Sequence, residues 1–279
     1  MKTLYLTDLD GTFLRSDATV SPFARETINA LSAQGVLFTI STARTYATVI
    51  PLFRGVDLRS PLVLMNGVCI YDAKHTKTIR HHAMPISIGR QCEEIFARYG
   101  KNPMLYFEKD SRIRVEYKFL VNAPQEEYVA QRDNFFNKGF TQVEHYGFDR
   151  GEDFIYIVTL DKKEEIEDIY REVSVLPGVN VNFYPDNYTG CYFLEGMPAG
   201  VSKASGALEV KKLLGADKIV AFGDNMNDIP LFAAADESYA VANACDELKA
   251  IATGVIGSND EDAVAHFLLD RFQSGTINT

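Results

Sequence analysis

The chain has 279 residues, 46% of them hydrophobic and 24% charged, the balance of a globular protein with one large domain or two medium ones. Its formal net charge of −10 at pH 7 argues against nucleic acid and against an anionic membrane surface as partners. An anionic substrate would therefore need a local cation, supplied by a metal ion or by a Lys or Arg side chain.

The cysteines are widely spaced and form no Cys-x-x-Cys pair, which disfavours a zinc site and a disulfide framework: Cys69, Cys92, Cys191 and Cys245. The N-terminus runs directly into an apolar strand and leaves no room for a signal peptide. No apolar stretch is long enough to cross a bilayer. We therefore expect a cytoplasmic protein with free thiols.

The first part of the chain alternates strands with helices. Ser21-Pro22 is typical of a helix start, and Gly35 is typical of a helix end. Near-continuous apolar strands separated by helices predict a parallel sheet covered on both faces. The elements expected here are strands at 4–7, 36–40 and 61–65, helices at about 22–35 and 45–53, and a hairpin at 69–71 and 78–80.

The pattern changes after Pro85. Polar and apolar residues alternate in several segments, which predicts antiparallel strands with one wet face, and helices between them are expected to cover the other face. The strands are expected at 104–107, 112–115, 154–158 and 179–183, and the helices around 126–137 and 163–173. This predicts an α+β domain at 85–192, with hinges near Met84-Pro85 and Tyr192–Gly196.

The strand and helix rhythm of the first part returns at Gly200. The chain should therefore form one discontinuous α/β core from residues 1–84 and 193–279. The elements expected after residue 200 are helices at 201–214, around 231–232 and at 261–272, strands at 218–222 and 239–241, and a frayed tail at 274–279.

Polar residues gather where the predicted core strands and one helix end or begin. Because the carboxyl ends of parallel strands meet at one edge of a sheet, these side chains should converge. Mg²⁺ favours carboxylates, whereas a hydroxyl, a lysine and N–H groups at helix N-termini hold phosphate oxygens. The converging residues are Asp8, Asp10, Thr42, Lys203, Asp224 and Asp228.

These residues belong to motifs that resemble those of the haloacid dehalogenase superfamily, in particular its Cof-type branch of sugar-phosphatase-like hydrolases. The Asn66-Gly67 strand end and the place and size of the insert also match, so the resemblance covers essentially the whole chain. Four motifs appear in the family's order: Asp8-Leu9-Asp10-Gly11-Thr12, Ser41-Thr42-Ala43-Arg44, Ser202-Lys203 and Gly223-Asp224-Asn225-Met226-Asn227-Asp228.

The resemblance implies a Rossmann-like parallel-sheet core with an α+β cap of the C2 type between the second and third motifs. The cap would cover the site and choose the substrate, and Tyr184, Asn187 and Tyr188 are candidate cap contacts. The family usually has glycine where this chain has Ala43 and Ala204. This departure could narrow the pocket or shift nearby backbone N–H groups.

The resemblance also implies the reaction: a Mg²⁺-dependent phosphatase that hydrolyses small phosphorylated metabolites, with sugar phosphates favoured. Asp8 would be the nucleophile that forms an aspartyl-phosphate, and Asp10 would be the general acid and base. Asp8, the backbone carbonyl of Asp10 and Asp224 would bind the metal ion.

The remaining motif residues would bind the phosphoryl group or support those that do. Phosphate or substrate binding is implied for Thr42, Ala43, Lys203 and Asn227. Supporting roles are implied for Asp228, which would orient Lys203 or a metal-bound water, for Asn66, and for Arg44, which would form a structural salt bridge or contact the substrate.

Two alternatives stay open from the sequence. A phosphomutase on the same scaffold would return the phosphoryl group to the sugar, and a regulator that has lost turnover would only bind a phosphorylated metabolite. A dinucleotide redox enzyme is disfavoured because no Gly-x-Gly-x-x-Gly follows the first strand. The physiological substrate, the degree of promiscuity and the choice between a monomer and a small homo-oligomer also stay open.

Overall fold

The computed structural model describes residues 1–136, 139–186 and 189–276. The chain forms two compact units, which we call the core unit (Met1–Arg80 with Ser202–Thr279) and the inserted unit (His81–Val201). Three predictions fall partly outside the described residues: the helix end at Asn137, the cap contacts Asn187 and Tyr188, and the last part of the frayed tail.

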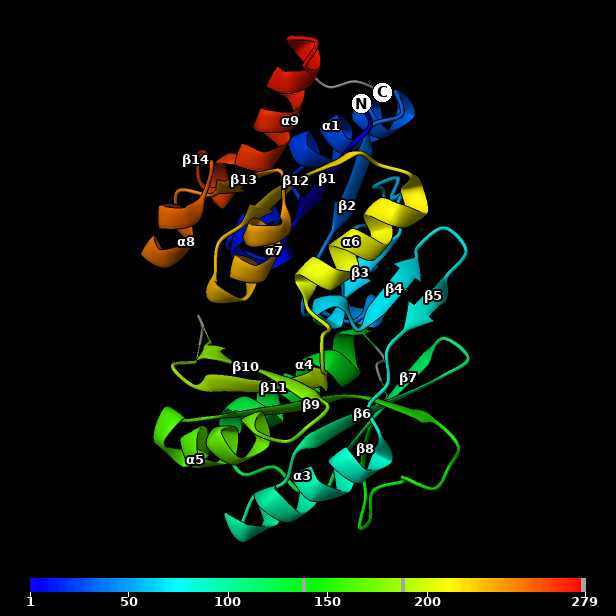
Figure 1. The fold of residues 1–279 in the computed structure, drawn as a ribbon, viewed down its shortest axis with the longest axis vertical. Helices are drawn as coiled ribbons and strands as arrows, with labels where there is room; N and C mark the ends of the chain where they lie inside the picture. Colours follow the sequence, from blue (N-terminus) through cyan, green and yellow to red (C-terminus); the bar gives the residue numbers. More distant parts are fainter. Residues whose placement is uncertain (137–138, 187–188, 277–279) are drawn as a thin grey trace. The chain divides into compact units, whose positions relative to one another are not determined.

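The core unit is built on a five-stranded parallel sheet with the order β14-β13-β12-β1-β2 (Figure 1). In β1 and β12 successive side chains are buried, and successive side chains point to opposite faces, so both faces are covered. The strands are β1 (Thr3–Thr7), β2 (Leu37–Ile40), β12 (Lys218–Gly223), β13 (Glu237–Ala240) and β14 (Gly254–Val255).

The helices of this unit begin and end largely where local chemistry predicts. Ser21 accepts a hydrogen bond from Ala24 N at the start of α1, and Ser202 forms a capping box at the start of α6, which ends at the left-handed Gly215. The helices are α1 (Pro22–Ala33), α2 (Tyr46–Val49), α6 (Lys203–Leu214), α7 (Ile229–Ala234), α8 (Asp246–Ile251) and α9 (Ala263–Gln273).

Two predicted elements of the core unit differ from the structure. The helix expected at 45–53 is confined to α2, because Pro51 lacks the backbone N–H that would continue the helical hydrogen bonds. The strand expected at 61–65 is β3 (Leu62–Leu64), which pairs antiparallel with β4 (Cys69–Asp72) in a separate sheet with β5 (Lys77–His81). Its parallel link to the main sheet is the single bridge between Ser41 and Val63.

The inserted unit is built on a six-stranded sheet with the order β10-β11-β9-β6-β7-β8. Its strand pairs are antiparallel except for β7 and β8, which run parallel. The strands are β6 (Met104–Lys109), β7 (Arg112–Tyr117), β8 (Phe140–Gln142), β9 (Asp153–Asp161), β10 (Val179–Pro185) and β11 (Tyr192–Pro198), and the helices are α3 (Ile86–Arg98), α4 (Ala123–Phe136) and α5 (Lys163–Ser174).

Helices cover both faces of this sheet, which corrects the prediction of one wet face. On one face, α3 and α5 bury Phe96 and Ile169 in a cluster with Leu105 of β6. The next residue of β6, Tyr106, points to the opposite face, where its hydroxyl lies 2.9 Å from that of Tyr128 on α4. Figure 1 likewise shows α4 on the side of the sheet opposite α3 and α5.

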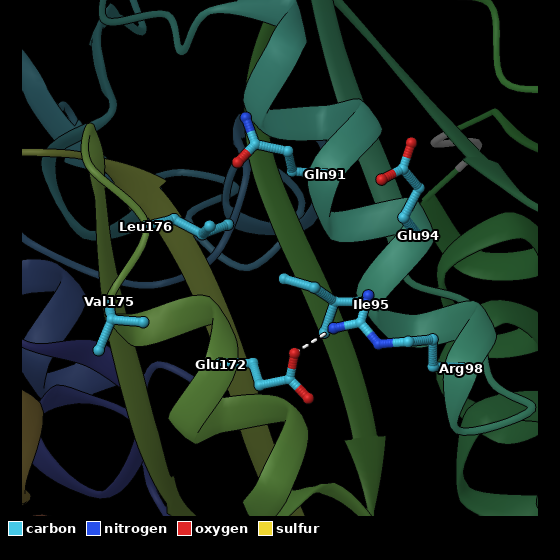
Figure 2. A pocket seen from close by; sticks show the side chains of 7 residues that line it. All are labelled: Gln91, Glu94, Ile95, Arg98, Glu172, Val175 and Leu176. Carbon is cyan, nitrogen blue, oxygen red and sulfur yellow. Dashed lines mark hydrogen bonds and ion pairs between the residues drawn. The ribbon is translucent and has the colours of Figure 1, made fainter.

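The surface between α3 and α5 forms a shallow depression, and the side chains of Arg98 and Glu172 pair across it (Figure 2). The Tyr99 hydroxyl also donates a hydrogen bond of 2.6 Å to Glu172. Both contacts join α3 to α5 at the edge of the buried cluster. The depression is lined by Gln91, Glu94, Ile95, Arg98, Glu172, Val175 and Leu176.

The second hinge, expected near Tyr192–Gly196, is wrong, because these residues lie inside β11. This strand pairs with β9 on one side and β10 on the other, and its Leu194 and Met197 are buried. A strand with partners on both sides cannot serve as a flexible connection. The inserted unit therefore extends to Val201, beyond the boundary expected at 192.

The fold class is confirmed: an α/β core with a parallel sheet carries an inserted unit with a sheet of its own. The insert leaves the core after β5 and returns at α6, so it lies between the second and third motifs. The described helices are all too short or too polar to cross a membrane.

A fragment of residues 81–201 is expected to fold alone, because the inserted unit has its own buried apolar cluster. A fragment of residues 85–192 should stay unfolded, since it loses nearly all of β11 from the middle of the sheet. Circular dichroism with thermal melting would compare the two fragments. Equal cooperative melting of both would contradict the importance of β11.

Candidate active site

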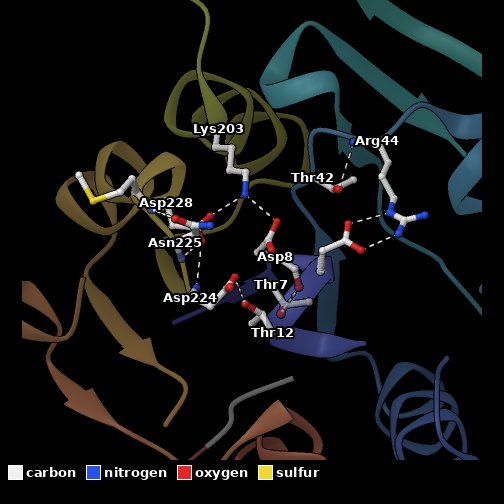
Figure 3. A network of polar contacts seen from close by, with 11 residues as sticks. Thr7, Asp8, Thr12, Thr42, Arg44, Lys203, Asp224, Asn225 and Asp228 are labelled. Atoms are coloured by element: carbon white, nitrogen blue, oxygen red, sulfur yellow. Dashed lines mark hydrogen bonds and ion pairs between the residues drawn. The ribbon is translucent and has the colours of Figure 1, made fainter. Parts of the chain in front are cut away.

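The polar residues of the core unit gather at the carboxyl ends of β1, β2 and β12 (Figure 3). These strands are parallel neighbours, so their ends meet at the same edge of the sheet. The tight turn Leu9–Phe13 follows β1, and the turn Met226–Asp228 follows β12. The N-terminus of α6 adds Lys203 to the same group.

Lys203 is the buried cation of the site, with 1% of its surface exposed. Its Nζ donates hydrogen bonds of 2.6 Å to Asp8 Oδ1 and 2.6 Å to Asp228 Oδ1, and Figure 3 shows it pointing between the two carboxylates. Burial disfavours its charge, but the two carboxylates outweigh burial and raise the pKa of Lys203. The side chain is therefore held in its charged form.

Asp228 fixes the turn after β12 as well as Lys203. Its Oδ2 accepts hydrogen bonds from the backbone N–H groups of Asp224 (3.0 Å) and Asn225 (3.2 Å). A Cβ atom on Gly223 would lie 2.7 Å from Asp228 Cγ, so the close packing of this turn requires glycine. Both carboxylate oxygens of Asp228 thus have hydrogen-bond donors.

Asp224 is held by the turn that follows β1. Its Oδ1 accepts a 2.9 Å hydrogen bond from the Thr12 hydroxyl, and both residues are buried. Gly11 has a φ of +76°, and a Cβ atom there would lie 2.4 Å from Asp224 Oδ2. Only glycine lets the backbone of this turn approach the carboxylate so closely.

The crowding of buried carboxylates shifts their titration. Burial raises the pKa of Asp8 well above its usual range, and the charges of Asp228 and Asp224 raise it further while Lys203 opposes them. Burial and the charge of Asp228 raise the pKa of Asp224 to about 7. A bound cation would favour the ionised form of both groups.

Asp8, Asp224 and Asp228 form a group that could hold a metal ion, because carboxylate oxygens from all three lie within 4.8 Å of one another. A set of hard oxygen donors fits Mg²⁺. Asp10 takes no part through its side chain, which faces Arg44.

A second group of possible ligands, His81, Glu108 and Asp153, lies in the inserted unit. Nδ1 of His81 lies 3.1 Å from Glu108, and Nε2 lies 2.7 Å from Asp153. The two carboxylates lie at different nitrogens of the ring, so this arrangement is that of a histidine held between two carboxylates.

Thr42 and Arg44 lie in the loop after β2, which a second turn holds in place. The N–H of Asn66 donates to the carbonyl of Thr42 (2.9 Å), and that of Met65 donates to the carbonyl of Arg44 (3.0 Å). Met65 and Asn66 both have positive φ, of 52° and 54°. Backbone in this region is strained for residues with side chains, and such strain is common at functional sites.

The same turn packs against the start of α6. Gly67 has a φ of +98°, and a Cβ atom there would lie 2.2 Å from the carbonyl oxygen of Ser202. A Cβ atom on Gly206 would lie 3.0 Å from Cα of Gly67. The turn Met65–Gly67 therefore links the loop that carries Thr42 to the helix that carries Lys203.

Arg44 and Asp10 form a two-pronged ion pair. Arg44 Nε donates to Asp10 Oδ2 at 2.7 Å, and Arg44 Nη2 donates to Asp10 Oδ1 at 2.5 Å. The pair joins the end of β1 to the loop after β2. Of the two contacts expected for Arg44, the structure contains the salt bridge.

Hydrogen bonds and ion pairs join the expected site residues in two groups, Asp8, Lys203, Asp224 and Asp228 in one and Asp10, Thr42, Arg44 and Asn66 in the other. Ala43 and Asn227 are half-buried in the same loops. The side chain of Tyr184 packs on the ring of Phe193 in the inserted unit, with 5.7 Å between the ring centroids.

Sequence reasoning missed three residues that shape the site. Thr12 holds Asp224, Asn225 caps the turn after β12, and the side-chain amide of Asn243 donates a 2.7 Å hydrogen bond to the carbonyl of Gly11. Thr12 and Asn225 lie inside recognised motifs, so their polar side chains were a usable signal. Asn243 lies outside the motifs, and its contact spans 232 positions of the chain.

Comparison with known proteins identifies related sequences and folds. The family model for haloacid dehalogenase-like hydrolases matches residues 5–268. A 5-amino-6-(5-phospho-D-ribitylamino)uracil phosphatase of Bacillus subtilis is 27% identical, over 95% of this chain and 96% of that protein. A pyridoxal phosphate phosphatase of Escherichia coli is 25% identical, over 94% of this chain and 95% of that protein.

Solved structures share the fold. A haloacid dehalogenase-like hydrolase from Bacteroides thetaiotaomicron superimposes with a TM-score of 0.78 at 20% identity, covering 97% of this chain and 99% of that one. One from B. subtilis gives 0.79 at 21% identity, covering 96% and 99%. At such low identity these matches bear on the fold alone.

Gly67→Ala is expected to lower the free energy of unfolding by more than about 2 kcal/mol, because the added Cβ collides with Ser202 O and the backbone conformation is strained. Gly215→Ala is the matched control: its φ is also positive (+61°), but a Cβ there meets nothing within 4 Å. Denaturant unfolding would measure both. A loss for Gly67→Ala no larger than for Gly215→Ala would contradict the clash.

Asp224→Asn is expected to raise the melting temperature of the metal-free protein at pH 8. The folded protein keeps a proton on Asp224, whose pKa is about 7, that the unfolded chain releases near pH 3.8. The contribution of this proton to the free energy of unfolding is fully present below about pH 4. It is lost as the pH rises through about 7, at up to about 1.4 kcal/mol per pH unit. The variant should lack this loss, and Mg²⁺ should stabilise it less than wild type.

Melting curves from pH 4 to 8, with Mg²⁺ or with chelator, would test this expectation. Asp57→Asn is the control, because Asp57 forms an exposed ion pair with Arg59. The expectation fails if Asp224→Asn melts below wild type at pH 8 without metal.

Proposed function

This chain belongs to the haloacid dehalogenase-like hydrolase family and is a phosphatase, and we propose that it works through an aspartyl-phosphate on Asp8. The observation that carries the proposal is the buried group in which Lys203 bridges Asp8 and Asp228 beside Asp224. Such a group offers a nucleophile, a fixed positive charge and oxygen ligands for a cation at one place.

The proposed metal ion is Mg²⁺, held by Asp8, Asp224 and the backbone carbonyl of Asp10. The hard carboxylate oxygens of the group support this choice over a softer metal. When bound, Mg²⁺ would supply positive charge against the oxygens of the transferring phosphoryl group. Asp228 would mainly hold other protein groups in place and would not bind the metal ion directly, because its oxygens already accept hydrogen bonds from Lys203 and from two backbone N–H groups.

In the first step, a carboxylate oxygen of Asp8 attacks phosphorus and the bond to the leaving oxygen breaks. The electron pair stays on that oxygen, which takes a proton from the Asp10 carboxyl group and leaves as an alcohol. In the second step, Asp10 takes a proton from water as the water oxygen attacks the aspartyl-phosphate. Phosphate leaves, and Asp8 returns as a carboxylate.

The phosphoryl oxygens would be bound by the Thr42 hydroxyl, the Lys203 ammonium, backbone N–H groups near Ala43 and the Asn227 side chain. The burial of Lys203 supports this role, since charge acts more strongly away from water. The Lys203 ammonium group would also give a protein with a net charge of −10 a local positive charge that binds an anionic substrate.

We propose small phosphorylated metabolites as substrates, with sugar phosphates as the first class to test. The relatives named above act on a ribitylaminouracil phosphate and on pyridoxal phosphate, both small phosphorylated molecules. The inserted unit would act as the cap that selects among them. The proposed location is the cytoplasm, which the free state of the four cysteines supports.

Asp8→Asn is expected to abolish phosphate release, at least about a thousandfold, because the amide cannot form the intermediate. Removal of Mg²⁺ by a chelator should do the same for wild type, reversibly. Phosphate release from a panel of sugar phosphates, nucleotides and pyridoxal phosphate would measure both effects and rank the substrates.

Two outcomes would change the proposal. Interconversion of sugar phosphates without phosphate release would indicate a mutase. Undiminished turnover by folded Asp8→Asn protein would remove Asp8 as the nucleophile.

A further inference from the structure

The ion pair between Arg44 and Asp10 is unlike a surface salt bridge. Both carboxylate oxygens of Asp10 are engaged, at 2.7 and 2.5 Å, by two nitrogens of one guanidinium group. The side chains are 22% and 35% exposed, so the pair is partly shielded from water. A two-pronged contact fixes the plane of the carboxylate as well as its position.

Arg44 stands on a backbone that is fixed from two sides. Its N–H donates to the Thr42 hydroxyl at 3.1 Å, and its carbonyl accepts from Met65 N at 3.0 Å. Met65 is held with a φ of +52°, an unfavourable conformation that the surrounding contacts must maintain. The guanidinium group therefore extends from a rigid base.

Asp10 also stands on a fixed backbone. The next residue, Gly11, has a φ of +76° and packs against Asp224, and its carbonyl accepts a 2.7 Å hydrogen bond from Asn243. The orientation left to be set is that of the Asp10 side chain, and Arg44 sets it.

We propose that Arg44 is a positioning residue that acts through Asp10, fixing the direction of the carboxyl group that exchanges protons with the leaving group and with water. This inference rests on the proposed function. The two nitrogens of Arg44 contact both carboxyl oxygens of Asp10 and so fix the direction in which that group faces the site. Misdirection of a proton-transfer group by about 1 Å can cost two orders of magnitude in rate.

The test is a double-mutant cycle with Asp10→Asn, Arg44→Gln and the two combined, because a residue that acts only through another has no effect once that other is gone. Asp10→Asn should lower kcat by about 10²–10⁴. Arg44→Gln should lower kcat by about 10–100-fold with little change in KM. In the Asp10→Asn background, Arg44→Gln should change kcat by less than about twofold.

The choice of substrate sharpens the test. An alkyl phosphate has a poor leaving group that needs the proton, whereas p-nitrophenyl phosphate has a good one that does not. Arg44→Gln should therefore impair release of the alkyl group more than release of p-nitrophenol, which would be followed as a pre-steady-state burst. Arg44→Lys, which keeps the charge but loses the fork, should restore only part of the rate.

Arg15→Gln is the matched control, because Arg15 forms a two-pronged pair with Asp262 in the same unit. It should leave both substrates' kcat values close to wild type, and thermal melting should show all variants folded. If Arg44→Gln does not fold, Arg44→Lys replaces it in the cycle.

Two outcomes would overturn the inference, and they are distinguishable. Independent, multiplicative effects of the two substitutions, with a rise in KM, would assign Arg44 to substrate binding and leave the proposed function intact. Full activity of Asp10→Asn would remove the proton-transfer role of Asp10, and the inference with it.

Discussion

The site depends on one buried ammonium group. Carboxylate oxygens of Asp8, Asp224 and Asp228 lie within 4.8 Å of one another, and all three side chains are buried. The ammonium group of Lys203 is the positive charge placed beside them. Burying charge is costly unless it is paired, and removing one partner of a buried pair leaves an uncompensated charge. Lys203 contacts Asp8 and Asp228, but burial, together with the neighbouring carboxylates, still raises the pKa values of Asp8 and Asp224. A bound cation would favour the ionised form of both groups.

The short turn Met65–Gly67 contacts both the loop that carries Thr42 and the start of the helix that carries Lys203. On one side it holds the loop of Thr42 and Arg44 through backbone hydrogen bonds, and on the other it packs against Ser202 at the start of α6. This strained turn therefore helps to set the position of the Thr42 hydroxyl relative to the Lys203 ammonium group. Strain of this kind persists only where the surroundings determine it fully.

The sequence predicted the elements whose signals are local: the apolar run of β1, the Ser21 cap and the Gly215 stop. Motif order identified the residues of the site. Prediction from the sequence failed for elements whose structure depends on pairing with residues far away in the chain. The sequence of β11 mixes polar and apolar residues and contains Gly196, which is typical of a linker. Its pairing with β9 and β10 makes it a strand. The contact of Thr12 with Asp224 likewise joins residues 212 positions apart, which no local pattern reports.

The division into two units places the residues of the proposed reaction in one of them. Every hydrogen bond and ion pair described for the site joins residues of the core unit, whereas the inserted unit has its own sheet and its own apolar cluster. Under the proposal that the inserted unit acts as a cap, substitutions in it would alter what is bound and would leave the carboxylates, the lysine and the turn Met65–Gly67 in place. Large changes in substrate preference are compatible with one unchanged phosphoryl-transfer site, since a fold constrains the chemistry less than the site does.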